Sequence, residues 1–572
     1  MRFASSILSI ALLLPLSTGL FGQNSKLAPD LAALLNNPSN STKQVDVIVQ
    51  LNPPGLLQTV TGLVGLLPGV NRLLYTLIPA VTQTLPVASI LSLANLSNVR
   101  YISLDRPVGA TVTAATDYSH VAIGANFAAS YGLTGEGIGV AILDSGIANH
   151  ADLAGRVVYR ESFVSSKNAD DYGHGSHVAG IVAGNGAASQ SGVKGIAPGV
   201  KLIDLRVLDA NGMSSDSVII AAIDRAVQLS SKYNIRIINL SVGRPVYESY
   251  KNDPLVQAVE AAWKKGIVVV VAAGNFGRSG YSTILSPGNS PLAITVGAMK
   301  TLDTQSTSDD QIASYSSKGP TWGDLVVKPD LVAPGNLIMS LRTPGSTLDR
   351  TYPSSGVDSN YARLSGTSMA APMVSGAAAL MLQRTPGLTP DVVKARLMKT
   401  ASKSFPLVSA TVDPTTHVVY PATYDMYTVG AGYLNLLGAL NNYDSTSRSA
   451  ASPAVTYKLA AGQALLTAAT QTVWDNNLWS LANVWGTHAL EPLTAAWGSA
   501  AAWGSAAAWG STAAWGSAAA WGSSAAWGST SPWGSSAAWG STAAWGSSAA
   551  WGSAAAWGSS AAWGSSTNGK GE

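Results

Sequence analysis

Four short stretches of the chain carry side chains that together could activate a hydroxyl group. Asp144 and Asn275 each follow an apolar run, His174 begins a segment of small residues, and Ser368 lies in the sequence GTSMAAP. A serine hydroxyl is a weak nucleophile until a base removes its proton, and imidazole suits that task near neutral pH. A carboxylate can orient the imidazole, and an amide can hold a developing oxyanion. These residue types predict acyl transfer.

Ser368 is expected at or near the N-terminus of a helix over residues 368–383, with Pro372 in its first turn. Proline fits a first turn because its missing N–H has no partner there. A helix N-terminus offers free N–H groups and a positive potential, which suits a hydroxyl that becomes an anion. On this stretch alone, an alanine-rich buried helix with a capping hydroxyl is an equal alternative.

The other stretches also have structural interpretations. Asp144 could be a turn acid and Asn275 a turn residue. Asp170 and Asp171 are expected to be solvated loop acids or helix-start charges. His174 and His177 lie at i, i+3 and could bind a metal as a pair, but no third ligand stands at a recognisable spacing. Chance occurrence of all four stretches in this order is improbable.

The elements that must position these residues alternate between strands and helices from about residue 111 to residue 443. Continuous apolar runs such as 267–271 indicate a sheet that is buried on both faces. The fold class is therefore α/β: an open, mostly parallel sheet with helices on both faces. Functional residues of such sheets gather beyond the carboxyl ends of the strands. The expected strands cover 139–143, 201–207, 236–240, 267–272 and 292–296, and the expected helices 174–183, 215–230, 254–265, 368–383 and 390–400.

Composition narrows the function. With 572 residues the chain is longer than one ordinary domain. Its net charge of +3 and the lack of any Lys/Arg run give no indication that it binds nucleic acid. Arg2 followed by a short apolar run predicts a secretory signal over residues 1–22, with a short membrane anchor as the alternative. The chain has no cysteine, so its stability must come from core packing alone or from core packing together with a bound metal. Residues 23–108 read as a small α+β unit, with strands over 45–50 and 99–104 and a helix over 88–96.

Beyond a linker at residues 446–490, a tail at 491–572 repeats the unit Trp-Gly-Ser-x-x-x with a period of six residues. In an extended strand an even period puts every Trp on one face, whereas an α-helix would scatter them. A disordered or partly ordered tail and an ordered β-stack both remain open. We expect the tail to contact a surface, a glycan or other copies of itself, because exposed apolar groups usually mark interaction sites.

Five motifs resemble those of the subtilisin-like serine proteases, the subtilases, over roughly residues 111–443. They are LDSG (143–146), HGSHVAG (174–180), NLSVG (239–243), AAGN (272–275) and GTSMAAP (366–372). The resemblance implies that Ser368 is the nucleophile, His174 the general base and acid, and Asp144 the residue that orients His174. It further implies an oxyanion hole formed by Asn275 and the Ser368 N–H. Ser241, Val242 and Gly243 resemble the edge that pairs with an extended substrate.

The resemblance also implies the organisation of the whole chain. Residues 23–108 are similar to an inhibitory propeptide, and 109–445 would be the peptidase domain. The expected protein is a secreted serine endopeptidase that acts on polypeptides through an acyl-enzyme, is inhibited by its own propeptide, and cleaves itself between about Asp105 and Thr116. No cofactor is expected for catalysis. Asp152 resembles a calcium ligand of some members, whereas the loop 184–194, which often supplies further ligands, has no acid; the expectation of structural calcium therefore rests on Asp152 alone.

Two positions depart from the family pattern. Ser176 replaces a threonine, which keeps the hydroxyl. Leu285 falls near the position at which some members have a glycine in the wall of the specificity pocket. The preference of this chain for substrate side chains is therefore left open. Two alternative functions remain open. One is a surface-binding protein in which the Trp repeats bind and the peptidase domain is inert, and the other is a metal-dependent hydrolase built on His174 and His177.

Overall fold

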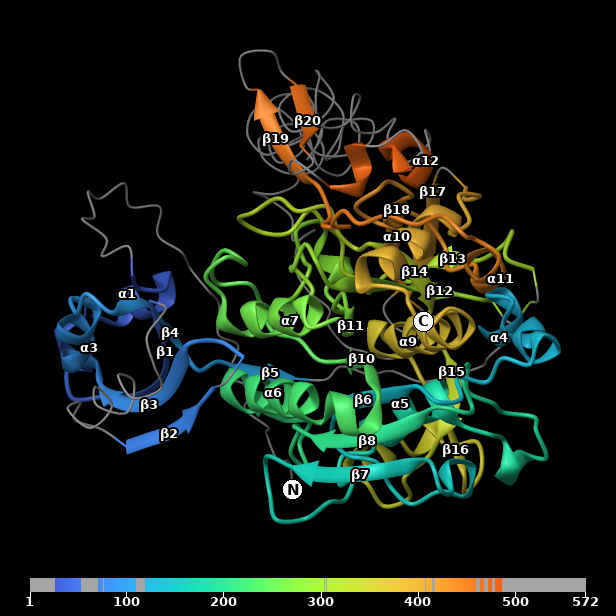
Figure 1. The fold of residues 1–572 in the computed structure, drawn as a ribbon, viewed down its shortest axis with the longest axis horizontal. Coiled ribbons are helices and arrows are strands. Elements are labelled where there is room, and N and C mark those ends of the chain that lie inside the picture. The colour runs from blue at the N-terminus through green and yellow to red at the C-terminus, as the bar shows by residue number, and fades with distance from the viewer. Residues whose placement is uncertain are drawn as a thin grey trace.

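A computed structural model gives the fold of the chain (Figure 1). It describes residues 26–52, 70–109, 119–458, 463–467, 472–475 and 479–485, apart from residues 36, 76, 303, 305, 407 and 414–416. The expected signal over residues 1–22 and the Trp repeats over 491–572 lie outside the described residues. A small N-terminal unit stands beside a larger α/β domain, and the short strand β5 (Pro107–Gly109) connects the two.

The N-terminal unit is an antiparallel sheet with strand order β2-β3-β1-β4, accompanied by two helices. Its core contains Val47, Val49, Ile90 and Ile102. The predicted strands and helix are therefore present, with small changes at their ends. The elements are α1 (Pro29–Leu35), β1 (Gln44–Leu51), β2 (Val70–Leu74), β3 (Ala80–Pro86), α3 (Val87–Ala94) and β4 (Val99–Leu104).

The larger domain is built on one sheet with strand order β13-β12-β11-β10-β6-β8-β7, and β14 also pairs with β12. Every neighbouring pair is parallel except β12 and β13. The predicted mostly parallel sheet is thus confirmed. Its strands are β6 (Gly139–Asp144), β7 (Val157–Ser162), β8 (Lys201–Arg206), β10 (Ile235–Leu240), β11 (Val268–Ala272), β12 (Ile294–Lys300), β13 (Gln311–Ile312) and β14 (Leu331–Pro334).

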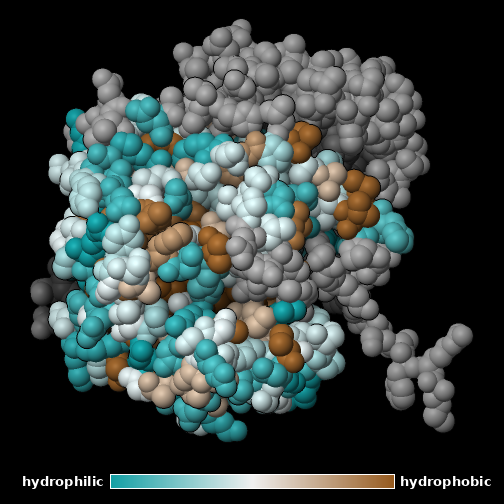
Figure 2. Space-filling view, turned by 90° about the vertical axis from the view of Figure 1, so that its right-hand side faces the viewer, coloured by the Kyte–Doolittle hydropathy of each residue, from teal (hydrophilic) through white to brown (hydrophobic). Residues whose placement is uncertain are grey.

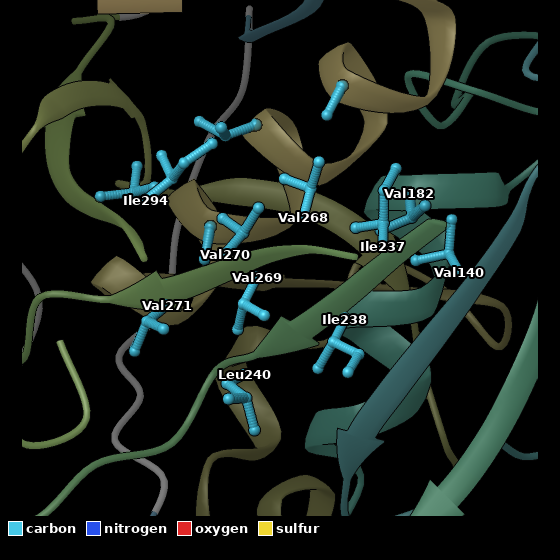
Figure 3. Packing of buried hydrophobic residues seen from close by; sticks show 14 of the residues in the cluster. Val140, Val182, Ile237, Ile238, Leu240, Val268, Val269, Val270, Val271 and Ile294 are labelled. Carbon is cyan, nitrogen blue, oxygen red and sulfur yellow. The ribbon is translucent and has the colours of Figure 1, made fainter. Parts of the chain in front are cut away.

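Two helix pairs cover the sheet. Helices α5 (His174–Ala183) and α9 (Thr367–Arg384) pack together, as do α6 (Asp216–Tyr233) and α7 (Pro254–Lys264). Figure 3 shows Val268 and Val270 projecting from one face of β11, and Val269 and Val271 from the other. All four valines are buried, which explains why their stretch of sequence is continuously apolar.

Shorter elements complete the domain around the sheet and its two helix pairs. They are α4 (Ser119–Ala122), β9 (Met213–Ser215), β15 (Ile338–Leu341), α8 (Thr347–Thr351), β16 (Tyr361–Leu364), α10 (Pro390–Thr400), β17 (Val408–Val412), β18 (Val419–Thr423), α11 (Leu436–Leu440), β19 (Ala454–Lys458), β20 (Gln463–Thr467) and α12 (Leu481–Trp485). On the face shown in Figure 2, most described residues are hydrophilic or neutral, and apolar residues form small groups. Among the described helices, none has both the length and the apolar content needed to cross a membrane.

The segment after residue 445 packs onto the domain where the structure describes it. Trp479 and Trp485, which share the phase of the later repeats, are both 1% exposed, and Lys399 lies over the Trp479 ring. Helix α12 contacts α10. Earlier along the same segment, the Ser452 hydroxyl donates a hydrogen bond to Asp330 Oδ1. This part of the expected linker therefore contributes to the folded domain.

Asp330 is the centre of a fully buried ion cluster. Its carboxylate lies 2.7 Å from Lys328 Nζ and 3.0 Å from Lys394 Nζ. The two ammonium groups hold the pKa of Asp330 below its usual value against the opposing effect of burial, and burial lowers the pKa of Lys328 to about 7. Such a cluster tolerates the loss of a partner poorly, because the remaining charges stay buried.

We predict that Asp330→Asn lowers the free energy of unfolding by about 3–5 kcal/mol, since it leaves two buried lysines without their carboxylate. Urea denaturation measures the change. Lys264→Gln is the control, because it removes only the 3.8 Å ion pair between a well-exposed ammonium group and Glu260, and it should change stability by no more than about 0.5 kcal/mol. Equal urea midpoints for the two variants would show that the cluster is neutral in the folded protein.

Candidate active site

The predicted site residues follow the ends of three adjacent parallel strands. Asp144 ends β6, Ser241 follows β10, and Asn275 lies three residues beyond β11. Since β6, β10 and β11 are neighbours that run in the same direction, their carboxyl ends meet at one edge of the sheet. The N-terminal ends of α5 and α9, which carry His174 and Ser368, belong to the two helices that pack against each other.

Asp144 and His174 form a buried pair. His174 Nδ1 lies 2.7 Å from Asp144 Oδ1, and both side chains are fully buried. Because an ionised carboxylate only accepts hydrogen bonds, Nδ1 carries the proton, and neutral His174 presents Nε2 as the acceptor. Within the described part of the chain, Nε2 has no hydrogen-bond partner. The imidazole is thus held in the tautomer that a general base needs.

Ser368 exchanges two hydrogen bonds with Ser241. Its Oγ donates to the Ser241 carbonyl oxygen at 3.1 Å, and the Ser241 hydroxyl donates to the Ser368 carbonyl oxygen at 2.9 Å. The Ser368 hydroxyl is therefore not bonded to His174 here, and catalytic hydrogen bonds often form only when substrate binds. Asn239 Nδ2 in turn donates to Ser241 Oγ at 3.0 Å and fixes that hydroxyl.

The position of Pro372 corrects the sequence analysis. Helix α9 begins at Thr367, so Pro372 is its sixth residue and lies beyond the first turn. Proline cannot donate the bond that the carbonyl four residues earlier would receive, and that carbonyl belongs to Ser368. The Ser241 hydroxyl supplies the missing donor. Pro372 thus frees a carbonyl in the turn that carries Ser368, and Ser241 uses it to fix that turn.

Asn275 is oriented through its oxygen. Asn275 Oδ1 accepts hydrogen bonds from the backbone N–H and the hydroxyl of Thr367, both at 2.9 Å. The Thr367 hydroxyl also accepts a bond from Gly274 N at 3.0 Å. Since Thr367 directly precedes Ser368, these contacts tie the amide to the start of α9. The Nδ2 end of the amide is the end that can donate to an oxyanion.

The proposed substrate edge lies against Leu285. Val242 is buried, and a Cβ placed on Gly243 would lie 3.0 Å from Leu285 Cβ. A Cβ placed on Gly274 would lie 2.6 Å from Leu285 Cγ. Leu285 therefore packs between the Ser241–Gly243 edge and the residue before Asn275, where it limits the space for a side chain.

Asp170 is a candidate positioning residue that the sequence analysis missed. It was expected to be a solvated loop acid or a helix-start charge, but it is fully buried, and burial raises its pKa. Its carboxylate accepts four hydrogen bonds, from Ser145 Oγ, Gly173 N, Ser176 N and Ser176 Oγ, at 2.6–2.9 Å. Because Ser145 follows Asp144 and Gly173 precedes His174, Asp170 joins the two loops of the pair.

Its neighbour Asp171 behaves as expected. The Asp171 side chain is 43% exposed and pairs with Arg206 at 3.0 Å. No local feature of the sequence distinguishes the two acids. Only the hydroxyls of Ser145 and Ser176, which need an acceptor when buried, offered a signal, and they lie 25 and 6 residues from Asp170.

The contacts of His177 oppose the metal-pair alternative for His174 and His177 at one of its two ring nitrogens. Its Nε2 lies 3.1 Å from the carbonyl oxygens of both Ile338 and Ala362, so this nitrogen must carry a proton. Burial lowers the pKa of His177 to about 3, which keeps the ring neutral. In the part of the chain that the structure describes, no three His, Cys, Asp or Glu side chains are grouped so as to hold a metal ion.

The residues around Asp152 do not fit a calcium ion well. Its Oδ1 accepts a bond from Ala188 N and its Oδ2 one from the Tyr361 hydroxyl, both at 2.7 Å. Its own N–H donates to His150 Nδ1 at 3.1 Å. Calcium needs six to eight oxygen ligands, whereas here both carboxylate oxygens face hydrogen-bond donors.

Comparison with known proteins identifies relatives of this chain. Residues 135–439 match the Subtilase family (Peptidase_S8). The chain is 44% identical to serine protease AprX of Bacillus subtilis over 319 residues, which is 54% of this chain and 71% of that protein. It is 39% identical to subtilisin DY of Bacillus licheniformis over 275 residues, covering 47% of this chain and 86% of the relative.

A solved structure has a similar fold. Fervidolysin from Fervidobacterium pennivorans, described as a keratinolytic enzyme related to subtilisin, superposes with a TM-score of 0.55 at 22% sequence identity. The match covers 72% of this chain and 63% of that chain. At this identity the likeness concerns the fold alone.

We predict that Asp170→Asn lowers kcat/KM by about 10²-fold, the effect of displacing a catalytic group by roughly 1 Å. The amide nitrogen would face hydrogen-bond donors, so the contact between the Asp144 and His174 loops should loosen. Peptide hydrolysis measures the effect. Asp171→Asn is the matched control, because it removes only a partly exposed ion pair. Similar activities for the two variants would show that Asp170 does not position the pair.

Proposed function

Since the chain belongs to the subtilase family of serine endopeptidases, we propose that it is a secreted endopeptidase that matures by cutting its own precursor. Asp144, His174 and Ser368 would act as the catalytic triad, with Asn275 in the oxyanion hole. The observation that carries this proposal is the buried 2.7 Å contact between Asp144 and His174 Nδ1, which leaves Nε2 as the proton acceptor.

The proposed reaction has two halves. Ser368 Oγ attacks the carbonyl carbon of a peptide bond while His174 Nε2 takes its proton, and Asp144 stabilises the resulting imidazolium. Asn275 Nδ2 and the Ser368 N–H hold the oxyanion. The C–N bond then breaks, and His174 gives its proton to the leaving amine. Water, activated by His174, hydrolyses the acyl-enzyme and releases the second product.

Substrate recognition would rest mainly on backbone pairing. An extended peptide that adds to the Ser241–Val242–Gly243 edge gains main-chain hydrogen bonds that depend little on its sequence. Leu285, packed against Gly243 and Gly274, would favour small side chains beside this edge. We propose polypeptides in general as the substrates.

The end of the N-terminal unit supports the precursor part of the proposal. Strand β5 pairs antiparallel with β9, from Pro107 opposite Ser215 to Gly109 opposite Met213. Gly212, directly before β9, packs on the ring of Tyr172, which lies two residues before His174. The chain therefore runs along β5 towards His174. We place the cleaved bond after Gly109 and before Thr116, and the segment from residue 23 to that bond would remain as an inhibitor.

The other parts of the proposal concern location and accessory contacts. The residues 1–22 would direct export, and the Trp repeats would contact a surface, a glycan or other copies. The catalytic steps need no metal. Structural calcium stays a proposal without support at Asp152, and a shift of the melting temperature on adding a chelator would test it.

Ser368→Ala should remain a full-length precursor after signal removal and should not degrade casein, because the substitution removes the hydroxyl that we propose as the nucleophile. Intact mass and N-terminal sequencing of the secreted protein measure this. The wild-type protein should react with a fluorophosphonate probe at Ser368. A Ser368→Ala protein that still matured and degraded casein would refute the proposal.

Two outcomes would favour the rival functions. Absence of probe labelling in wild type would favour a binding protein with an inert peptidase domain. Loss of activity with a chelator, but not with a serine-directed inhibitor, would favour a metal-dependent hydrolase. The serine inhibitor is the cleaner test, because a chelator would also weaken a calcium-stabilised subtilase.

Deleting residues 491–572 tests the tail separately. We expect hydrolysis of a short peptide to stay unchanged, because all proposed catalytic residues lie before residue 445, whereas retention at the producing cell's surface or solubility should change. If localisation and solubility both match the full chain, the proposed contact role of the tail is wrong.

A further inference from the structure

We propose that Glu248 and Tyr247 form an acidic subsite that binds an arginine or lysine side chain of the substrate, on the N-terminal side of the cleaved bond. Arg106 fills this acidic subsite in the precursor. The inference rests on the proposed function, because it requires that substrates bind along β9 as β5 does.

Arg106 occupies the place of a substrate residue. It directly precedes β5, and its carbonyl oxygen accepts a hydrogen bond from Asp216 N at 2.8 Å, which extends the pairing of β5 with β9 by one residue. Asp216 also pairs with Arg244, the residue after Gly243, at 2.8 Å. Strand β9 and the Ser241–Gly243 edge are therefore held side by side, and Arg106 lies on the peptide path next to them.

The guanidinium of Arg106 is bound by the peptidase domain. Its Nη1 donates to Glu248 Oε1, and its Cζ lies 5.2 Å from the centre of the Tyr247 ring. The side chains of Arg106 and Glu248 are only 3% and 1% exposed. A charge-assisted hydrogen bond and an aromatic face are two features that recognise a cationic side chain in a desolvated pocket.

The groups around the Arg106–Glu248 pair come from both units. Asp30, which binds Arg106 Nε and Nη2 at 3.0 Å, and Tyr101, whose pKa is raised by burial and by Glu248, belong to the N-terminal unit. They would leave together with Arg106 when that unit is removed. Glu248 and Tyr247 stay with the mature domain.

The charges that remain favour a cation. Arg244 is already paired with Asp216 and with Asp253, each at 2.8 Å, so it does not neutralise Glu248. Burial raises the pKa of Glu248, and Arg106 is the main group that opposes this effect. Removing one partner of a buried ion pair is costly because the other charge loses its compensation. A substrate arginine or lysine would restore the pair.

A simpler interpretation is that the pair only fastens the propeptide. It predicts that Glu248 affects maturation and inhibition but not the choice among short substrates. Peptides that lack the N-terminal unit, and with it Asp30 and Tyr101, therefore separate the two interpretations.

The experiment uses the mature enzyme released by the full chain and internally quenched peptides that copy residues 104–118. One peptide keeps Arg at position 106, and three others carry Lys, Gln or Glu there. Mass spectrometry ensures that the same bond is compared. We expect kcat/KM to be about 10–100-fold higher for Arg than for Gln, the usual effect of one hydrogen bond to a charged group. Lys should be intermediate and Glu poorest.

Glu248→Gln should bring the Arg-to-Gln ratio of kcat/KM close to one, chiefly through a loss of rate on the Arg peptide. Asp324→Asn is the control: Asp324 binds Ser249 Oγ and Tyr250 N at 2.7 and 2.8 Å on the same loop, but it does not contact Arg106. This variant should affect all four peptides equally.

The outcomes separate the two proposals. If wild type cleaves none of the peptides and no protein, the proposed function fails. If it cleaves the Arg and Gln peptides equally well, or if Glu248→Gln keeps the preference, the acidic subsite is wrong. If Glu248→Gln does not mature, the wild-type series decides: a preference for Arg and Lys that weakens with added salt supports the acidic subsite, and its absence overturns it.

Discussion

The proposed active site is built around one buried carboxylate, Asp170, that is not among the proposed catalytic residues. A carboxylate in the protein interior is unfavourable unless donors surround it, and Asp170 receives four hydrogen bonds from three residues. Those residues are neighbours of Asp144 and His174, so satisfying Asp170 also fixes the separation of the pair. The 2.7 Å contact between the two is in this sense a consequence of the Asp170 network. Such networks are rigid only when every member is satisfied.

Ser368, the proposed nucleophile, is held in place by the same kind of hydrogen bonding between backbone and side chain. Pro372 removes a donor inside α9, and the freed carbonyl of Ser368 is taken by Ser241, which comes from the end of β10. Thr367 binds Asn275 and Gly274 in the same way from the other side. Strand ends and helix starts are therefore joined by short hydroxyl bridges. These bridges explain how loops can place side chains with the accuracy that catalysis requires.

The sequence was sufficient for the sheet, the helices and the four stretches that carry the site, because apolar runs and local motifs depend on neighbouring residues. It was not sufficient for contacts between distant segments. Asp170 could not be separated from Asp171, because the burial of one arises from Ser145, 25 residues away. Helix α9 begins one residue earlier than expected, and Pro372 is its sixth residue, beyond the first turn that the sequence analysis assigned to it. The burial of Trp479 and Trp485 was hidden by the repeat pattern that they share.

A buried carboxylate needs compensating partners, and three such groups in this chain show that this requirement can serve stability, positioning or recognition. Asp330 is paired with lysines of its own domain, and Asp170 accepts hydrogen bonds from uncharged donors of its own domain. Glu248 differs because its cationic partner, Arg106, lies 142 residues away on the segment that we propose to be separated from the domain. A buried charge whose partner can leave is the only one of the three whose pairing energy becomes available to another molecule. Where a precursor is held by such a pair, the contact that closes the site and the contact that selects a substrate are physically the same.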